Sequence, residues 1–174
     1  MDFIVQEAVK NQQNINYENM VGQANIKVIG VGGGGSNMVS WLYKKGVKGA
    51  EIAACNTDKQ HLDMTNSDRK ILIGKDLTRG LGCGGFPDKG AEAAQESIQE
   101  IKDTVKSTDM AFICAGMGGG TGTGAAPVIA QVVKDSGAIV IGTVTMPFSI
   151  ERARIDKAEF GLQQLRQVSD TVIV

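Results

Sequence analysis

The stretch GMGGGTGTG, residues 116–124, joins an apolar run, DMAFICA at residues 109–115, to an amphipathic segment at residues 123–134. A turn from a strand into a helix needs one glycine, whereas this stretch holds six. Without side chains, the backbone N–H groups and the positive end of the next helix are free to receive an anion. We interpret the stretch as one half of a phosphate site, in which the Thr121 and Thr123 hydroxyls cap the helix or bond phosphate oxygens.

The alternation of apolar runs and amphipathic segments continues in both directions along the chain. Each run is apolar nearly throughout, which is typical of strands covered on both faces. The pattern predicts an α/β fold, a doubly wound, Rossmann-like parallel sheet of six strands in the order 3-2-1-4-5-6 with helices on both faces. The expected strands are residues 25–31, 50–56, 69–74, 109–115, 138–146 and 170–174, and the expected helices are residues 37–45, a short one after Asp58, 88–105, 123–134 and 155–168. Residues 1–22 precede the pattern as an extension with one short helix, and residues 23–174 form the domain.

Glycine is concentrated at three places rather than spread over the turns. The chain has 23 glycines in 174 residues, where about 12 would be usual. Five, six and six of them lie in residues 30–35, 74–90 and 116–124, seventeen in all. The first place, GVGGGGSN at residues 30–37, ends one expected strand and opens a helix. Strands one and four are neighbours in the expected order, so the first and third glycine stretches would face one crevice and bind a long polyphosphate.

Two further segments follow expected strands and carry weaker signals. The glycine-rich loop of residues 74–90 could close Arg79 over a terminal phosphate, or it could be a mobile surface loop. Asn56 and Asp58 in CNTD could orient the waters of a cation or bond a ribose. Asp58 could equally be a helix cap. The first glycine stretch could also be a tight turn without a ligand.

Several classes of protein are disfavoured by what the sequence contains. With 18 basic and 19 acidic residues the net charge is -1, which argues against a nucleic-acid-binding module. Three cysteines without CxxC spacing favour neither a disulfide framework nor a zinc site, and no apolar stretch is long enough to span a bilayer. We therefore expect a cytoplasmic chain without a metal site. GxxxxGK[ST] is absent, so the phosphates are not held by a P-loop lysine, and His61 is expected to be a surface or packing residue.

Taken together, these motifs resemble those of the tubulin and FtsZ superfamily, and the FtsZ branch in particular. The similarity in order and spacing covers residues 25–174, and the variant ERAR at residues 151–154 is similar to archaeal members. It departs from the usual pattern of a glycine after the glutamate and an arginine four residues beyond it. The segments that carry the resemblance are GVGGGGSN, NTD at residues 56–58, LTRGLGCGG at residues 77–85, GGGTGTG at residues 118–124 and PFSIE at residues 147–151.

The resemblance implies that GTP or GDP is the ligand and leaves a need for Mg²⁺ open. Asn37 would approach the guanine, Cys83 and Gly84 would lie near the γ-phosphate, and Glu151 and Arg154 would bond the ribose region. The expected nucleotide-binding residues are Gly33, Gly34, Gly35, Ser36, Asn37, Asn56, Asp58, Cys83, Gly84, Gly119, Gly120, Thr121, Gly122, Thr123, Glu151 and Arg154.

The resemblance also implies partners. Family members polymerise head to tail at the division site, where membrane anchors can join them, and an acidic loop resembling NxDxxD from the adjacent subunit completes hydrolysis. NxDxxD, the central helix and the second domain are absent from these residues, and the last strand ends abruptly at Val174. We therefore expect a truncated nucleotide-binding half without a catalytic residue of its own. It would bind GTP or GDP more weakly than the complete protein, because the helix that closes over the base is absent, would not turn over alone and could cap a filament.

Two other readings remain open. Gly30, Gly32, Gly35 and the later Asp58 match the pattern of an NAD-binding oxidoreductase domain. A non-hydrolysing structural homologue with a vestigial pocket is the other. The glycine stretch at residues 116–124 has no use in the former, and the intact glycine stretches argue against the latter.

Overall fold

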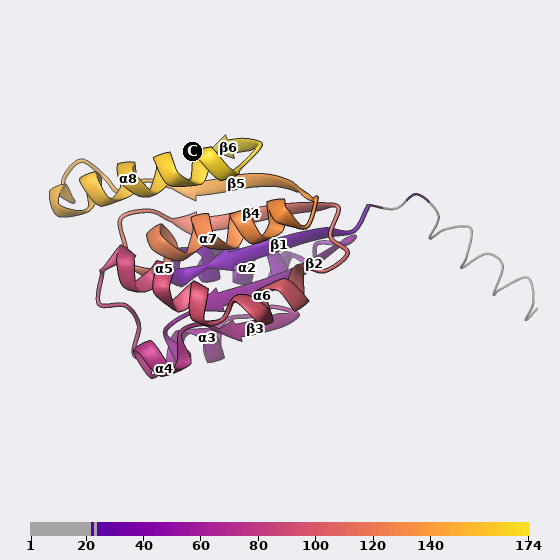
Figure 1. Cartoon of the computed structure of the whole chain (residues 1–174), viewed down its shortest axis with the longest axis horizontal. Coiled ribbons are helices and arrows are strands. Elements are labelled where there is room, and N and C mark those ends of the chain that lie inside the picture. The colour runs from indigo at the N-terminus through magenta and orange to yellow at the C-terminus, as the bar shows by residue number, and fades with distance from the viewer. Residues whose placement is uncertain (1–21, 23) are drawn as a thin grey trace, which may run out of the picture.

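The computed structural model describes residue 22 and residues 24–174 as one α/β domain (Figure 1). The short helix expected within residues 1–22 lies outside the described residues, apart from Gly22. The strands are β1 (Ile26–Val31), β2 (Ala50–Asn56), β3 (Arg69–Leu72), β4 (Met110–Gly116), β5 (Ile139–Thr145) and β6 (Thr171–Ile173). The helices are α2 (Gly32–Lys45), α3 (Lys59–Met64), α4 (Lys75–Thr78), α5 (Pro87–Glu96), α6 (Ile98–Val105), α7 (Thr121–Asp135) and α8 (Arg152–Val168).

All six strands form one parallel sheet in the order β3-β2-β1-β4-β5-β6, which confirms the predicted fold class. The central strands are the most apolar, as strands buried on both faces must be. β1 pairs with both β2 and β4, and Val31 at its end lies opposite Cys55 and Ala115. The turns that follow β1 and β4 therefore leave the sheet side by side.

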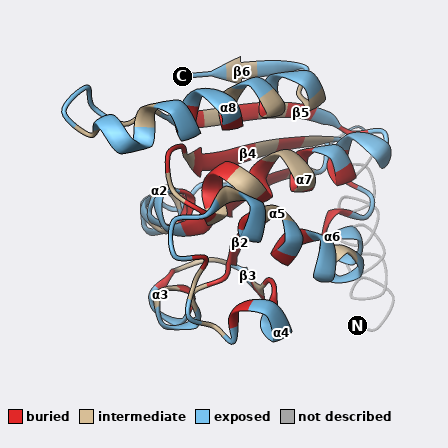
Figure 2. Cartoon of the chain, turned by 60° about the vertical axis from the view of Figure 1, so that its left-hand side comes forward, coloured by how far each residue is buried: buried red, intermediate tan, exposed pale blue. Residues whose placement is uncertain are grey.

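Helices cover both faces of the sheet, but unequally. The larger core lies between the sheet and α5, α6, α7 and α8, and includes Ile113, Ile129 and Leu165. The smaller core lies beneath α2 and α3 on the other face, around Val39 and Leu62. Figure 2 shows the buried residues concentrated in the middle of the sheet and along the inner sides of the helices. The sheet thus holds the ends of β1, β4 and β5 at fixed positions.

The single helix expected over residues 88–105 is wrong, because the chain forms two helices there. Ser97 interrupts the helix because its backbone angles, φ -98° and ψ 19°, are not helical. It is buried, and its hydroxyl accepts a hydrogen bond from the N–H of Gly74 at 3.0 Å. The apolar spacing continues across the break, so periodicity alone gives no sign of it.

Three helices begin earlier than expected, and each begins at a glycine-rich or polar turn. α2 starts at Gly32 rather than at residue 37, α7 at Thr121 rather than at 123, and α8 at Arg152 rather than at 155. Glycine lowers helix propensity by about 1 kcal/mol per residue, which hides the starts of α2 and α7 from a propensity argument. The long loop after β3 is also shorter than expected, since α4 and the start of α5 occupy part of it.

Candidate functional site

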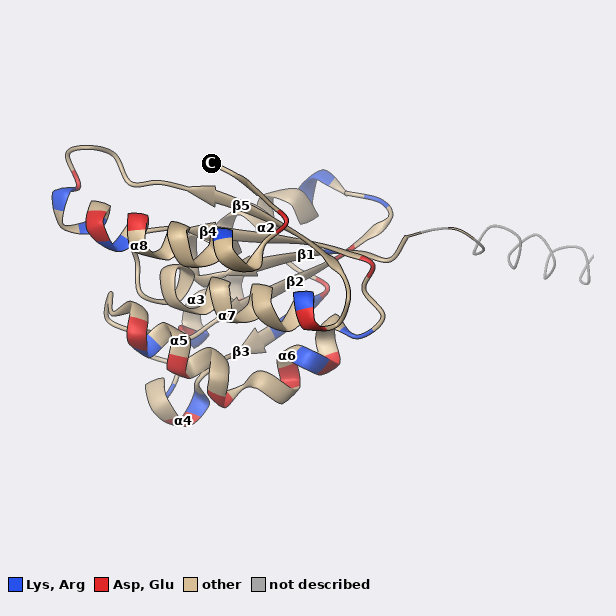
Figure 3. Ribbon diagram, turned by 45° about the horizontal axis from the view of Figure 1, so that its top comes forward, with Lys and Arg blue, Asp and Glu red and all other residues tan. Residues whose placement is uncertain are grey.

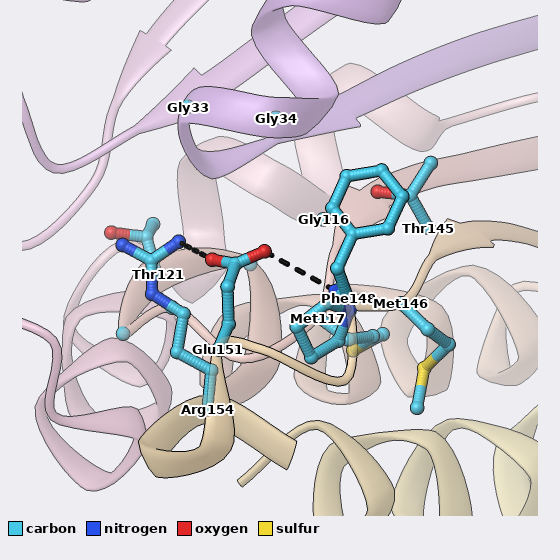
Figure 4. Close-up of a pocket in the computed structure, with 14 residues that line it drawn as sticks. Gly33, Gly34, Gly116, Met117, Thr121, Thr145, Met146, Phe148, Glu151 and Arg154 are labelled. Carbon is cyan, nitrogen blue, oxygen red and sulfur yellow. Dashed lines mark hydrogen bonds and ion pairs between the residues drawn. The ribbon is translucent and has the colours of Figure 1, made fainter.

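A cavity of about 570 Å³ opens at the carboxyl ends of β1, β4 and β5 (Figure 4). Gly34 from the start of α2 and Gly120 from the turn before α7 both line it. Its volume is typical of sites for small molecules and cofactors. The residues around it are Gly33, Gly34, Gly116, Met117, Gly119, Gly120, Thr121, Gly122, Thr145, Met146, Pro147, Phe148, Glu151 and Arg154.

The two glycine turns at this cavity pack directly against each other. A Cβ atom on Gly32 would lie 2.6 Å from the backbone nitrogen of Gly122, and one on Gly34 would lie 3.0 Å from the Cα of Gly116. Within the second turn, a Cβ on Gly122 would lie 2.5 Å from the carbonyl oxygen of Gly116. The contacts at Gly32 and Gly122 leave no room for a side chain and the contact at Gly34 is tight, so the glycines let the two turns meet as one unit. We call residues 30–35 together with residues 116–124 the glycine cradle.

Three helix N-termini point toward the cavity. α2 begins at Gly32, α7 at Thr121 and α8 at Arg152, and residues of all three starts line the space. The first turns of α2 and α7 hold no acidic residue, and their charged residues lie only near their C-terminal ends (Figure 3). The positive ends of the helix dipoles are therefore not neutralised, and they favour an anion in the cavity.

Glu151 and Arg154 lie at the rim, at the start of α8. Arg154 Nη1 donates to Glu151 Oε2 at 3.0 Å, and the N–H of Phe148 donates to Glu151 Oε1 at 3.2 Å, as Figure 4 shows. The side chain of Arg154 is 62% exposed and that of Glu151 is 34% exposed. An exposed ion pair contributes little to stability, so both groups can exchange this contact for one with a ligand.

Three of the expected site residues support the cradle from behind instead of lining the cavity. A Cβ on Gly35 would collide with the carbonyl oxygen of Cys114, so this glycine lets α2 pack on β4. Ser36 is fully buried, and its hydroxyl has no hydrogen-bond partner among the described residues. Thr123 is buried and its hydroxyl accepts from the N–H of Gly118 at 2.9 Å, which shapes the turn.

Asn37, Asn56 and Asp58 form a separate polar cluster beside the cavity, joined by His61. His61 Nε2 lies 3.0 Å from Asn37 Oδ1, and His61 Nδ1 lies 3.4 Å from Asn56 Nδ2. Asp58 caps α3 by accepting from the N–H of His61 at 3.0 Å. His61 also lies 3.4 Å from the Cβ position of Gly33, so it connects this cluster to the cradle. His61 therefore has a bonding role that the sequence did not indicate.

Cys83 and Gly84 belong to the loop of residues 79–86, which lies against the cradle. Cys83 is 4% exposed, and its Cβ lies 2.8 Å from the Cβ position of Gly120. Gly84 is exposed with a φ of 58. The loop is held by the N–H of Gly82, which donates to the carbonyl oxygen of Thr57 at 3.1 Å. Neither Cys83 nor Gly84 lines the cavity itself, but their loop borders it through Gly120.

The end of β5 contributes cavity residues that sequence reasoning did not name. Thr145, the last residue of β5, and Met146 after it line the cavity beside Gly116, the last residue of β4, and Met117 after it. The expected strand order already places β5 next to β4, so its end had to reach the same crevice. The sequence therefore held enough information to find these residues, because the predicted strand order alone places the end of β5 at the crevice, whatever its residue types are.

The described residues contain no group of three or more histidine, cysteine or acidic side chains that could hold a metal ion. Burial raises the pKa of Cys55 from 9.0 to about 12, with a smaller effect of Glu100, and burial raises the pKa of Cys114 from 9.0 to about 11. Both thiols are therefore neutral packing groups beneath the cradle. None of the helices described has the length and apolarity to cross a membrane.

Comparison with known proteins assigns residues 25–174 to the Tubulin/FtsZ family, GTPase domain. Cell division protein FtsZ 1 of Archaeoglobus fulgidus is 57% identical over 150 residues, which are 86% of this chain and 41% of that protein. The solved structure of the empty FtsZ dimer of M. jannaschii matches with a TM-score of 0.87 and 47% identity, over 94% of this chain and 48% of that one. The GTPγS-bound protofilament of CetZ2 from Haloferax volcanii matches with a TM-score of 0.77 and 27% identity, over 85% of this chain and 48% of that one.

The chain therefore belongs to the Tubulin/FtsZ family and carries its GTPase domain. It spans less than half the length of the relatives it matches.

Proposed function

We propose that the cavity binds GTP and GDP, with the phosphate chain lying between Gly34 and Gly120. The observation that carries the proposal is the convergence of two interlocked glycine turns and three helix N-termini on one cavity. A polyphosphate is the ligand that such free amides and positive helix ends suit best. The GTPγS-bound state of the CetZ2 protofilament, a structural relative, supports the same ligand.

The remaining expected residues are assigned to the two ends of the nucleotide. Asn37 contacts the base, Glu151 and Arg154 contact the ribose region, and Cys83 and Gly84 border the terminal phosphate. Gly35, Ser36 and Thr123 act through the backbone that they shape, since their own side-chain positions face protein. Mg²⁺, where it accompanies the nucleotide, would be held mainly by phosphate oxygens and water, because the one carboxylate of the neighbouring cluster, Asp58, already caps α3.

The domain acts as the nucleotide-binding part of a cytoplasmic cell-division GTPase whose subunits assemble head to tail at the division site. Glu151 is the single acidic residue that lines the cavity in the described part of the chain, and it is assigned here to the ribose region, at the other end of the nucleotide from the terminal phosphate. A carboxylate that activates the attacking water must then come from elsewhere, and an adjacent subunit is the source we propose.

Equilibrium binding of fluorescently labelled GTP, GDP and NAD⁺ to the purified chain tests the proposal. GTP and GDP should bind at one site and compete with each other, and NAD⁺ should not displace them. A dinucleotide uses a single glycine turn for its pyrophosphate, so preference for NAD⁺ would reject the proposal. Under the same conditions, the chain alone should hydrolyse no GTP. Hydrolysis with many turnovers and no added partner would refute the assignment of the catalytic carboxylate to another subunit.

A further inference from the structure

Thr57 lies directly after β2, outside the cavity, and is fully buried. Its hydroxyl oxygen lies 2.7 Å from Thr121 Oγ1 and 3.4 Å from Cys83 Sγ. Thr121 Oγ1 in turn lies 3.6 Å from Cys83 Sγ. Three side chains from three segments thus form a closed triangle of polar groups, which we call the hydroxyl–thiol triangle.

The backbone carbonyl of Thr57 also accepts hydrogen bonds. Its oxygen accepts from the N–H of Gly82 at 3.1 Å and lies 3.2 Å from the Thr78 hydroxyl, whose single proton it shares with the carbonyl oxygen of Gly74 at 2.9 Å. Both donors belong to the segment that leads into Cys83. Thr57 therefore fixes the loop of residues 79–86 through its carbonyl, while its hydroxyl reaches the first residue of α7.

One arrangement of the protons satisfies all three contacts of the triangle. The Cys83 thiol donates to Thr57 Oγ1, and the Thr121 hydroxyl donates to Cys83 Sγ. The Thr57 hydroxyl then has its proton free to donate to Thr121 Oγ1. Thr121 is the only member of the triangle that lines the cavity.

A phosphate oxygen in the cavity offers Thr121 a better acceptor than a thiol. Sulfur is a weak acceptor, whereas a hydrogen bond to an anionic oxygen is about twice as strong as a neutral one. The Thr121 hydroxyl can exchange Cys83 Sγ for the phosphate without losing the bond that it accepts from Thr57. That retained bond holds Thr121 in place and polarises its hydroxyl toward the ligand. The exchange also removes the hydrogen bond between Thr121 and Cys83, so that binding of the phosphate changes how the loop of residues 79–86 is held.

We propose that Thr57 is a positioning residue that acts through Thr121 and favours nucleoside triphosphate over diphosphate at this site. The inference depends on the proposed binding of a nucleotide in the cavity. The preference follows from the place of the loop, because Cys83 borders the Thr121 end of the cradle, where the proposed function puts the terminal phosphate.

Two substitutions separate the hydroxyl from the shape of the side chain. Thr57→Val keeps the branched shape and removes the hydroxyl, and Thr57→Ser keeps the hydroxyl. Affinities for a non-hydrolysable GTP analogue and for GDP are measured by calorimetry on the whole chain. Thr57→Val should bind the triphosphate about fivefold more weakly, the effect of one neutral hydrogen bond, and GDP less than about twofold more weakly. Thr57→Ser should stay within about twofold of the unmodified chain for both.

Thr104→Val provides a matched control elsewhere in the molecule. Thr104 on α6 is 4% exposed, and its hydroxyl donates to the carbonyl oxygen of Glu100 at 2.8 Å. Its substitution should change neither affinity. If Thr57→Val fails to fold, Thr57→Ala and Thr57→Ser make the same comparison, since they differ only in the hydroxyl.

The outcomes distinguish this inference from the function on which it depends. Equal losses for triphosphate and diphosphate, no loss for Thr57→Val, or a Thr57→Ser variant as weak as Thr57→Val would each overturn the role of Thr57. An unmodified chain that binds neither nucleotide would instead reject the proposed function.

Discussion

The glycine cradle and the loop of residues 79–86 are both rich in glycine, yet the residue serves a different purpose in each. At Gly35 and Gly122 of the cradle, glycine is required because neighbouring backbone atoms occupy the place of a side chain. In the loop, Gly80, Gly82, Gly84 and Gly85 have φ values of 75, 81, 58 and 78. Only glycine adopts such angles without strain.

The two regions also differ in what fixes them. The cradle is held by close backbone packing above the core, whereas the loop is held by single hydrogen bonds, such as that from the N–H of Gly82 to Thr57, and by a few side chains. Lys157 on α8 donates to the carbonyl oxygen of Gly85 at 2.9 Å, and its ammonium lies 5.7 Å from the ring centroid of Phe86. Changes in the cradle should therefore affect folding or ligand entry, and changes around the loop should affect how it responds to the ligand.

The largest expected effect is that of Gly35→Ala. The new methyl group meets the carbonyl oxygen of Cys114, so α2 must move away from β4. We expect the free energy of unfolding to fall by about 3 kcal/mol, at the upper end of the usual cost of overpacking. Urea denaturation followed by circular dichroism measures it. Gly33→Ala is the matched control, because its Cβ would lie 3.4 Å from the His61 ring, an ordinary contact. A loss no greater for Gly35→Ala than for Gly33→Ala would contradict the account of the cradle.

Gly119→Ala should weaken binding without weakening the fold. No atom lies within 4 Å of the Cβ position of Gly119, which lines the cavity. The methyl group would occupy space that the phosphate chain needs, so we expect affinity for GDP to fall about tenfold, or ~1.4 kcal/mol. Isothermal calorimetry gives the affinity, and thermal denaturation should show no change in stability. Unaltered affinity would mean that the ligand does not approach this part of the cradle.

The buried thiol of Cys55 beneath the cradle should make stability fall at alkaline pH. Its pKa rises from 9.0 to about 12 through burial, so the unfolded chain releases this proton first as the pH increases. The unfolded state is thereby favoured, and the free energy of unfolding should fall by about 1 kcal/mol per pH unit above pH 9. The difference between the unmodified chain and Cys55→Ala isolates this contribution from that of Cys114, whose pKa is also raised. Identical slopes for the two proteins between pH 8.5 and 10.5 would rule it out.

The smallest expected effect comes from Lys157→Met, which keeps most of the side-chain length and removes the charge. Loss of the bond to Gly85 and of the contact with Phe86 should loosen the loop alone. We expect limited proteolysis within residues 79–86 to become about threefold faster, since cleavage follows local opening. Lys157→Arg, which keeps a cation and its donors, should restore most of the protection. Cleavage at an unchanged rate would show that Lys157 does not hold the loop.

The fold and the positions of the glycine stretches could be predicted from the sequence, but the contacts around the site could not. Strands such as Ile26–Val31 are apolar throughout because both faces are buried, and this leaves a plain signal. The start of α2 at Gly32 was hidden, because packing between the two turns outweighs the low helix propensity of glycine. The link between Thr57 and Thr121 joins residues 64 positions apart, and no local pattern encodes it.

The most direct test of the central claim follows the backbone amides of the cradle during a titration with GDP. In ¹⁵N-resolved NMR spectra, the amides of Gly33, Gly34, Gly119 and Gly120 should shift together and give one dissociation constant, because both turns bind the same phosphate chain. Shifts confined to one of the two turns, or different constants for the two, would contradict it.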